Sequence, residues 1–214
     1  MASESAFFDL DPRRVAVVLI DFQNDFCSPE VFEGDKVTNT HNAVAAARAK
    51  RFAGDAHRHG AQVVYTRQVF DPANLTERQR RTAASAELCA AGSWGAELFI
   101  EPISGSAVVV KDRYDCWRSD KFVGHLEAHG VDGLVICGVE LVCCVLYAIL
   151  GAAERGYRYL VPEHLVSGQD VGDETDNRAI RDWLRYNQPE HLIEDENAIL
   201  ERWMTLRPPV SAGG

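Results

Sequence analysis

The sequence predicts an α/β fold: a single domain with a doubly wound, mostly parallel β-sheet and helices on both faces. Short apolar runs rich in β-branched residues alternate with longer segments of helical character, which is the order of strands and crossover helices in a parallel sheet. The 214 residues suffice for one domain with a substantial core and leave little room for a second. We expect one domain over residues 1–214, with its core at about 14–200 and a disordered tail at about 207–214.

The first half of the chain contains two strands and two helices in this pattern. Val15–Ile20 (VAVVLI) is a continuous apolar run, typical of a strand buried on both faces of a parallel sheet. An Ala-rich helix over Thr40–His59 ends at Gly60 and leads into a second strand, Ala61–Thr66. The polar segment Thr76–Cys89 is compatible with a second helix.

The second half continues the alternation. Ala107–Val110 predicts a third strand, and Phe122–His129 predicts a helix. A fourth strand, Leu134–Cys137, is followed by a break at Gly138 and then by a helix over about Val142–Gly156. The remaining predicted elements are a strand at Tyr157–Pro162, a helix at Glu174–Tyr186 and a short strand at His191–Glu194.

Composition and charge exclude several classes of function. The formal net charge of −10 argues against nucleic-acid and anionic-membrane partners. No apolar run approaches the length of a membrane span, and the N-terminus lacks the basic and apolar regions of a signal peptide, so we expect a cytoplasmic protein. The six cysteines form no Cys-x-x-Cys pair, which favours reduced thiols over disulfides or a zinc site.

Three polar residues stand just past the ends of predicted strands. Asp21 and Lys111 follow their strands directly, and Cys144 follows the fourth strand across a short turn. Ligands bind at the carboxyl edge of an open parallel sheet, so these side chains are expected to meet there. Each alone has a simpler interpretation, with Asp21 as a turn cap, Lys111 as a solvated strand end and Cys144 as a small core residue. Together they combine a base, a cation and a nucleophile, which favours a catalytic site.

This combination predicts acyl transfer by a thiol. Asp21 would serve as general base for Cys144, whose place at a helix start brings backbone N–H groups and the helix dipole near the sulfur. The Lys111 ammonium is expected to stabilise the carboxylate and the thiolate, and so to lower the pKa of the thiol. Backbone N–H groups of the turn would hold the oxyanion of a tetrahedral intermediate, and water would complete the reaction.

Three motifs carry a resemblance to a known family. They are VAVVLIDFQNDF, VVVKDRYDCW and ICGVELVCCV, and with their spacing they cover about residues 14–165. The chain resembles the isochorismatase-like cysteine hydrolases, which include nicotinamidases, N-carbamoylsarcosine amidohydrolases and ureidoacrylate amidohydrolases. The resemblance implies a catalytic triad of Asp21, Lys111 and Cys144. It indicates Cys144 over Cys143, because the nucleophile of the family stands six residues after the glycine corresponding to Gly138 and precedes a valine.

The resemblance also implies an unusual turn before the nucleophile. It predicts a cis peptide bond between Val139 and Glu140, with the backbone N–H groups of Glu140 and Cys144 forming the oxyanion hole. Nicotinamidases carry an Asp-x-His pair and a further histidine that bind a metal. Here the corresponding segment is Arg67-Gln68-Val69-Phe70, and no histidine occurs between residues 59 and 125, so we expect neither a metal nor a cofactor. Isochorismatases proper lack the cysteine and cleave a vinyl ether by acid chemistry, so Cys144 argues against that class.

Five residues are candidates for binding the substrate. Glu140 could recognise a cationic or amide N–H group, or could face solvent. Phe26, Trp94 and Trp117 could form walls of the pocket because relatives place aromatic residues near these motifs, or could pack in the core. Gln23 could bind amide groups of the substrate or orient the triad.

The predicted function is that of a metal-independent cysteine hydrolase. It would cleave a C–N bond of a small amide, carbamoyl or ureido compound through a thioester intermediate. Two alternatives stay open: a hydrolase that opens a lactam ring with the same triad, and a binding or assembly protein that keeps the triad without turnover. We expect a small-molecule substrate and a homo-oligomer, since relatives of this kind assemble.

Overall fold

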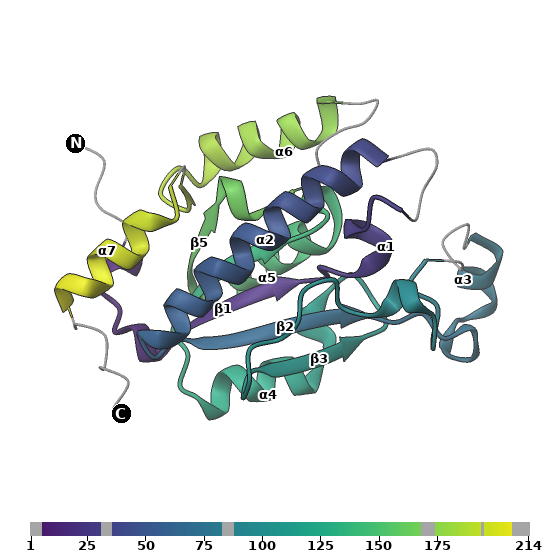
Figure 1. Ribbon diagram of the computed structural model, residues 1–214, viewed down its shortest axis with the longest axis horizontal. Helices are drawn as coiled ribbons and strands as arrows, with labels where there is room; N and C mark the ends of the chain where they lie inside the picture. Colours follow the sequence, from purple (N-terminus) through teal and green to yellow (C-terminus); the bar gives the residue numbers. More distant parts are fainter. Residues whose placement is uncertain (1–5, 31–35, 83–87, 168–173, 194, 207–214) are drawn as a thin grey trace.

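The sheet is six-stranded and wholly parallel, which confirms the predicted fold class. The computed structural model describes residues 6–30, 36–82, 88–167, 174–193 and 195–206, and the strand order is β3-β2-β1-β4-β5-β6 (Figure 1). The strands are β1 (Val15–Ile20), β2 (Gln62–Gln68), β3 (Ala107–Lys111), β4 (Gly133–Gly138), β5 (Arg158–Pro162) and β6 (Leu192–Ile193). The predicted tail at about 207–214 lies outside the described residues.

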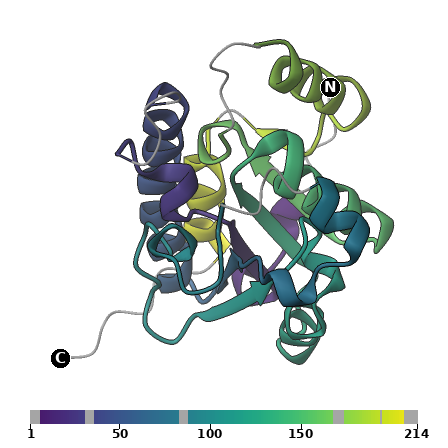
Figure 2. The same cartoon turned by 90° about the vertical axis from the view of Figure 1, so that its right-hand side faces the viewer.

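Helices cover both faces of this sheet (Figures 1 and 2). Alternate residues of β1 point to opposite faces, so Val17 packs in one apolar cluster and Val18 in the other. The first cluster includes residues of α2 and α7, and the second includes residues of α4, α5 and α6. The helices are α1 (Asn24–Cys27), α2 (Lys36–Arg58), α3 (Glu77–Thr82), α4 (Asp120–Ala128), α5 (Leu146–Glu154), α6 (Glu174–Asn187) and α7 (Asn197–Leu206).

Most predicted elements are shifted by a few residues at their ends, as in α2, which begins at Lys36, and β2, which extends to Gln68, and three differences are larger. The predicted helix over Thr76–Cys89 is wrong at its end, because Cys89 lies in a turn with a φ of 53°, and residues 83–87 lie outside the described part. The predicted helix over Val142–Gly156 begins as one π-helical turn, Leu141–Val145, before α5. Neither α1 nor α7 was predicted, and Glu194 of the predicted last strand lies outside the described residues.

The strand order reverses between β1 and β4, and their carboxyl ends form the topological switch point. The two strands approach closely at Gly138, whose φ is +144° and where a Cβ atom would lie 2.5 Å from the backbone oxygen of Ile20. Glycine is therefore required at the point where the chain leaves β4 and enters the turn before Cys144.

The cysteines and the helices bear on two further expectations from the sequence. All six cysteines are free thiols. None of the helices in the described residues is long and apolar enough to cross a membrane.

Candidate active site

The structure brings Asp21, Lys111 and Cys144 together at the carboxyl edge of the sheet. The Lys111 Nζ atom lies 2.6 Å from Asp21 Oδ2 and 3.6 Å from Cys144 Sγ. All three residues are buried, with exposed fractions of 0% for Asp21 and 5% for each of the others. The predicted meeting of the three side chains is therefore observed, and it occurs in a site with little access to bulk water.

Asp21 is held in place by its neighbours on β2. The Thr66 hydroxyl donates to Asp21 Oδ1 at 2.7 Å, which leaves Oδ2 to accept from Lys111. The backbone at Asp21 has a φ of 52°, a left-handed conformation that few residues other than glycine adopt. Such a conformation is maintained only where the surrounding structure enforces it. Here it occurs at Asp21, the residue that the sequence predicts to be the general base.

Gln68 is a member of the cluster that was not predicted. Its Oε1 atom accepts from Lys111 Nζ at 3.0 Å and lies 3.5 Å from Cys144 Sγ. Its backbone is clamped by the Gln23 side chain, which accepts from Gln68 N and donates to Gln68 O, both at 2.8 Å. Gln68 is the last residue of β2 and lies at the same edge of the sheet as Asp21, Lys111 and Cys144. Its place at the end of a strand is the signal from which it could have been predicted.

The protonation states follow from burial and from the charges within the site. Burial raises the pKa of the Cys144 thiol far above its ordinary value, the Asp21 carboxylate raises it further, and Lys111 opposes both. Burial lowers the pKa of Lys111, but the charges of Asp21 and Cys144 outweigh burial, so that pKa is raised. Lys111 thus lowers the pKa of the thiol, as expected, but burial outweighs this contribution and the pKa of Cys144 stays above its ordinary value. The raised pKa of Lys111 favours the ammonium, and the raised pKa of Cys144 favours the neutral thiol beside it.

The turn before Cys144 has the predicted backbone. The Val139–Glu140 peptide bond is cis, which confirms that expectation. The following residues form the π-helical turn, in which Cys144 is buried and Cys143 is half-buried. The segment after β5 fixes the turn from outside, since Ser167 O accepts from Leu141 N at 2.9 Å and Ser167 N donates to Gly138 O at 3.1 Å.

A small cavity lies over the Cys144 thiol. Its volume is about 190 Å³, and its walls are mostly apolar. The lining residues are Phe26, Gln68, Phe70, Leu88, Tyr114, Val139, Glu140, Cys143 and Cys144. Of the five residues predicted to bind substrate, only Phe26 and Glu140 line this cavity.

The other three predicted binding residues lie elsewhere. Gln23 is fully buried, and its amide is used by the backbone of Gln68 and by Ala96 O, to which it donates at 2.7 Å. Trp117 packs in the core, where its Nε1 donates to Ala148 O at 3.0 Å. The Trp94 side chain is 58% exposed and does not line the cavity. A single sequence does not distinguish an aromatic wall from an aromatic core residue, and the internal bonds of Gln23 span residues distant in sequence.

Glu140 places a carboxylate at the cavity. Its Oε1 accepts from Asn42 Nδ2 of α2 at 2.7 Å, and the same Nδ2 donates to Phe26 O at 2.8 Å. Asn42 thus holds two residues of the cavity wall. The charge of Glu140 adds to burial in raising the pKa of the neighbouring Cys143.

The described residues contain no group of three or more His, Cys, Asp or Glu side chains suited to a metal ion. Near the end of β2, Arg67 Nη2 pairs with Glu97 at 2.6 Å, and Phe70 lines the cavity. The Cys144 sulfur contacts the polar groups Lys111 Nζ and Gln68 Oε1.

Solved structures share this fold. A cysteine hydrolase from Pseudomonas syringae superposes with a TM-score of 0.79 at 18% identity, covering 96% of this chain and 99% of the other. An N-carbamoylsarcosine amidase from Thermoplasma acidophilum gives a TM-score of 0.67 at 21% identity, covering 85% and 99%. These similarities show a common architecture.

Sequence relatives point to the same family. A probable isochorismatase from Pseudomonas chlororaphis is 26% identical over 159 residues, which cover 69% of this chain and 68% of that protein. A ureidoacrylate amidohydrolase from Azorhizobium caulinodans is 28% identical over 153 residues, which cover 62% of this chain and 66% of that protein. The sequence model of the isochorismatase domain family matches residues 15–182 of this chain, which confirms the resemblance seen in the three motifs. The chain therefore belongs to the isochorismatase family of hydrolases.

Proposed function

We propose that this protein is a cysteine hydrolase that cleaves the C–N bond of a small amide, carbamoyl or ureido compound through a thioester. The observation that carries the proposal is the buried cluster of Asp21, Lys111 and Cys144 beneath a small cavity. The names of two similar proteins, a ureidoacrylate amidohydrolase and an N-carbamoylsarcosine amidase, support this class of bond.

The first step is a proton transfer within the site. Lys111 Nζ contacts both Asp21 Oδ2, at 2.6 Å, and Cys144 Sγ, at 3.6 Å, so the carboxylate and the thiol share one neighbour, and Asp21 accepts the thiol proton. Before the transfer the site holds a carboxylate, an ammonium and a thiol, and after it a carboxylic acid, an ammonium and a thiolate. Its net charge is unchanged, and Lys111 faces one anion in both states. A buried site tolerates this exchange better than it would tolerate losing a proton to water.

The thiolate then attacks the carbonyl carbon of the substrate. The negative charge that develops on the carbonyl oxygen is held by the backbone N–H groups of Glu140 and Cys144. Both stand at the start of a helix, where the first N–H groups lack partners within the helix and the dipole favours negative charge. This arrangement stabilises the tetrahedral intermediate without a charged side chain.

Asp21 completes both halves of the reaction. As the C–N bond breaks, the protonated Asp21 gives its proton to the leaving nitrogen and the Cys144 sulfur keeps the acyl group as a thioester. A water molecule then attacks the thioester carbonyl, and Asp21 accepts one of its protons. Collapse of this second intermediate releases the acid, and the thiol regains its proton from Asp21.

The cavity favours a small substrate that carries N–H groups. Its volume of about 190 Å³ lies below the roughly 300–1,000 Å³ of sites for drug-sized ligands. Aromatic side chains of Phe26, Phe70 and Tyr114 contribute to its walls, and Glu140 supplies an acceptor. We therefore assign to Glu140 the recognition of an amino or ureido N–H group of the substrate.

The test compares two adjacent cysteines. The wild type, Cys144→Ala and Cys143→Ala are incubated with a panel of linear amides, carbamoyl compounds, ureido compounds and lactams. Product amine or ammonia is measured, and the acyl-enzyme is sought by mass spectrometry. We expect turnover in the wild type and in Cys143→Ala, none in Cys144→Ala, and an acyl adduct on the peptide that contains residue 144. Equal activity in Cys144→Ala, or no product from any compound of the panel, would overturn the proposal.

A further inference from the structure

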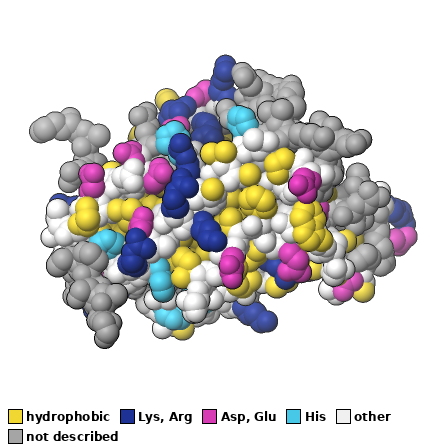
Figure 3. Space-filling model, in the orientation of Figure 1, with side chains coloured by type: hydrophobic (Ala, Val, Ile, Leu, Met, Phe, Trp, Pro, Cys, Tyr) yellow, Lys and Arg dark blue, Asp and Glu magenta, His cyan; other side chains and the backbone are white. Residues whose placement is uncertain are grey.

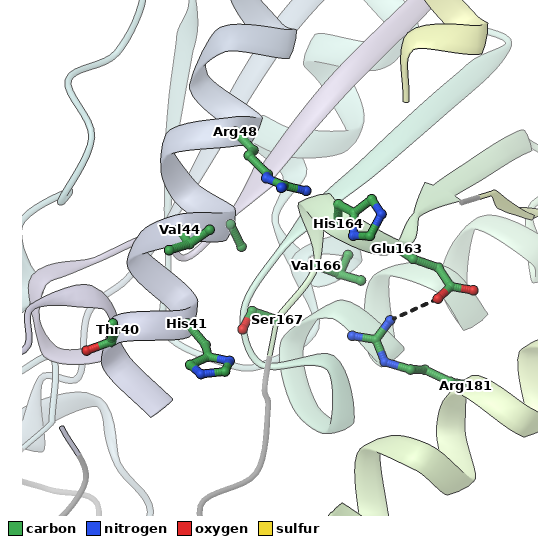
Figure 4. Close-up of a pocket in the computed structure, with 10 residues that line it drawn as sticks. Thr40, His41, Val44, Arg48, Glu163, His164, Val166, Ser167 and Arg181 are labelled. Carbon is green, nitrogen blue, oxygen red and sulfur yellow. Dashed lines mark ion pairs between the residues drawn. The ribbon is translucent and has the colours of Figure 1, made fainter. Parts of the chain in front are cut away.

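The Cys144 thiol lies where water cannot easily replace a hydrogen-bond partner. Elsewhere it can: a larger cavity of about 530 Å³, between α2, the segment after β5 and α6, is lined by charged side chains such as the pair of Glu163 and Arg181 (Figure 4). Figure 3 shows basic and acidic side chains spread over the surface of the molecule. Gln68 and Cys144, by contrast, are 1% and 5% exposed, so the donors and acceptors at the triad depend on partners within the protein.

The Gln68 side chain has a fixed position and a fixed orientation. Its backbone N and O atoms each bond to the Gln23 side chain at 2.8 Å. At the other end, its amide accepts from Lys111 Nζ at 3.0 Å. An ammonium has donors only, so the amide atom that faces it must be the oxygen, Oε1.

The same oxygen lies against the nucleophile. Gln68 Oε1 is 3.5 Å from Cys144 Sγ, and this sulfur is 3.6 Å from Lys111 Nζ, so the three atoms form a small triangle. An amide oxygen can only accept a hydrogen bond. Its contact with the sulfur is therefore attractive when the sulfur carries a proton and repulsive when the sulfur is a thiolate.

Gln68 also competes with the sulfur for the hydrogens of Lys111. The ammonium has three N–H groups. Three oxygens accept from it: Asp21 Oδ2 at 2.6 Å, Gln68 Oε1 at 3.0 Å and Arg113 O at 3.0 Å. The Cys144 sulfur is a fourth contact, so a thiolate could gain an N–H from Lys111 only if one of these oxygens gave it up. Gln68 Oε1 contacts both Nζ and Sγ, so its removal would free an N–H beside the sulfur.

We propose that Gln68 is a positioning residue that holds Cys144 in its thiol form in the resting site. It accepts from the thiol and occupies an N–H of Lys111, and both contacts disfavour the thiolate. The proposal rests on the proposed function, because it takes Cys144 as the nucleophile and Asp21 as the acceptor of its proton. Gln68 restrains that transfer, so the nucleophile of the empty enzyme reacts more slowly with an electrophile than Asp21 and Lys111 alone would allow.

The test removes the amide oxygen with two substitutions, Gln68→Met and Gln68→Leu. Both keep a side chain of similar size, and both leave the backbone atoms of residue 68 free to bond to Gln23. Alkylation of the full chain by iodoacetamide is followed peptide by peptide by mass spectrometry. We expect Cys144 to react about threefold or more faster in both variants, because the thiol loses a hydrogen bond that the thiolate does not make. The dependence of the rate on pH between pH 6 and 8 should stay as in the wild type, because no charge is removed.

Cys143 is the internal control for access, since it lines the same cavity as Cys144. Its rate should change less than twofold. An equal gain at both cysteines would overturn the proposal, because a wider cavity would explain it.

An unchanged or lower rate at Cys144, in a variant that keeps the circular dichroism and cooperative unfolding of the wild type, would also overturn the proposal. That result is expected if Gln68 only maintains the shape of the site. The two variants differ in side-chain shape, so if one fails to fold the other decides. Alkylation requires no substrate, so a failure here is distinguishable from a failure of the proposed hydrolase activity on the panel of amides.

Discussion

Replacing Asp21 by Asn tests how the buried charges depend on one another. The substitution keeps the shape of the side chain and removes the charge that lies 2.6 Å from Lys111 Nζ. The side chains of the pair are 0% and 2% exposed, so water does not replace the lost partner. Breaking a buried ion pair by removing one member costs about 3–5 kcal/mol. We expect the free energy of unfolding of Asp21→Asn to fall by about 3 kcal/mol at pH 7, because other acceptors still contact the ammonium.

The loss has a defined dependence on pH. In the wild type the pKa of Lys111 is raised above its ordinary value of 10.5, so the stability from the pair is fully present below that value and is lost as pH rises through the folded-state pKa. In Asp21→Asn, burial is no longer opposed by the carboxylate, and the pKa of Lys111 falls below that of the unfolded chain. The variant therefore gains stability as pH rises from 7 toward 10, and its difference from the wild type narrows.

Urea unfolding of three proteins at pH 7 and pH 10 measures these effects. The third protein is the double variant Asp21→Asn/Lys111→Met, in which no charge is left without a partner. We expect it to be more stable than Asp21→Asn at pH 7, because the apolar side chain removes the cost of the buried ammonium. The reasoning would be refuted if the double variant were less stable than Asp21→Asn at pH 7. It would also be refuted if the stability difference between Asp21→Asn and the wild type grew from pH 7 to pH 10.

Two other predictions concern the cavity wall and the packing of helices. Glu140→Gln should lower kcat/KM about tenfold or more for substrates with a charged amino group and less than threefold for neutral amides, because a charge-assisted hydrogen bond becomes a neutral one; equal losses for both would contradict the assigned role. Gly151→Ala in α5 should lower the melting temperature, because its Cβ would lie 2.1 Å from the Trp117 ring. Gly124→Ala in α4 should raise the melting temperature and add up to about 1 kcal/mol to the free energy of unfolding, because no atom lies within 4 Å of the new methyl group. A change of melting temperature in the same direction for both glycine variants would contradict the packing described.

Much of the fold was predictable because parallel strands carry a strong local signal. The run Val15–Ile20 is fully buried, as its continuous β-branched pattern indicates. Asp21 and Lys111 could be placed at one edge because parallel strands end at the same side of the sheet. The cis bond between Val139 and Glu140 came from the family resemblance, since no local pattern predicts it.

The features that the sequence did not predict correctly have a common physical cause, because each depends on contacts between segments that are distant along the chain. The role of Gln68 arises from its proximity to Lys111 and Cys144, which lie 43 and 76 residues away along the chain. Trp117 is in the core because it packs against α5, which its sequence neighbours do not reveal. The raised pKa of Cys144 follows from burial, and burial of a thiol at a helix start requires the surrounding structure.

In the proposed mechanism, Asp21 and Cys144 share one proton inside the site. A reactive form that has the same net charge as the resting form has a population independent of pH. The alkylation rate of Cys144 by iodoacetamide, followed peptide by peptide by mass spectrometry, should therefore be flat between pH 6 and 8. Ordinary thiols react about tenfold faster for each pH unit in this range, because only the thiolate is nucleophilic. Cys143 is the internal comparison, and Asp21→Asn should give Cys144 the same slope as Cys143. A tenfold rise per pH unit for Cys144 in the wild type would contradict the shared proton.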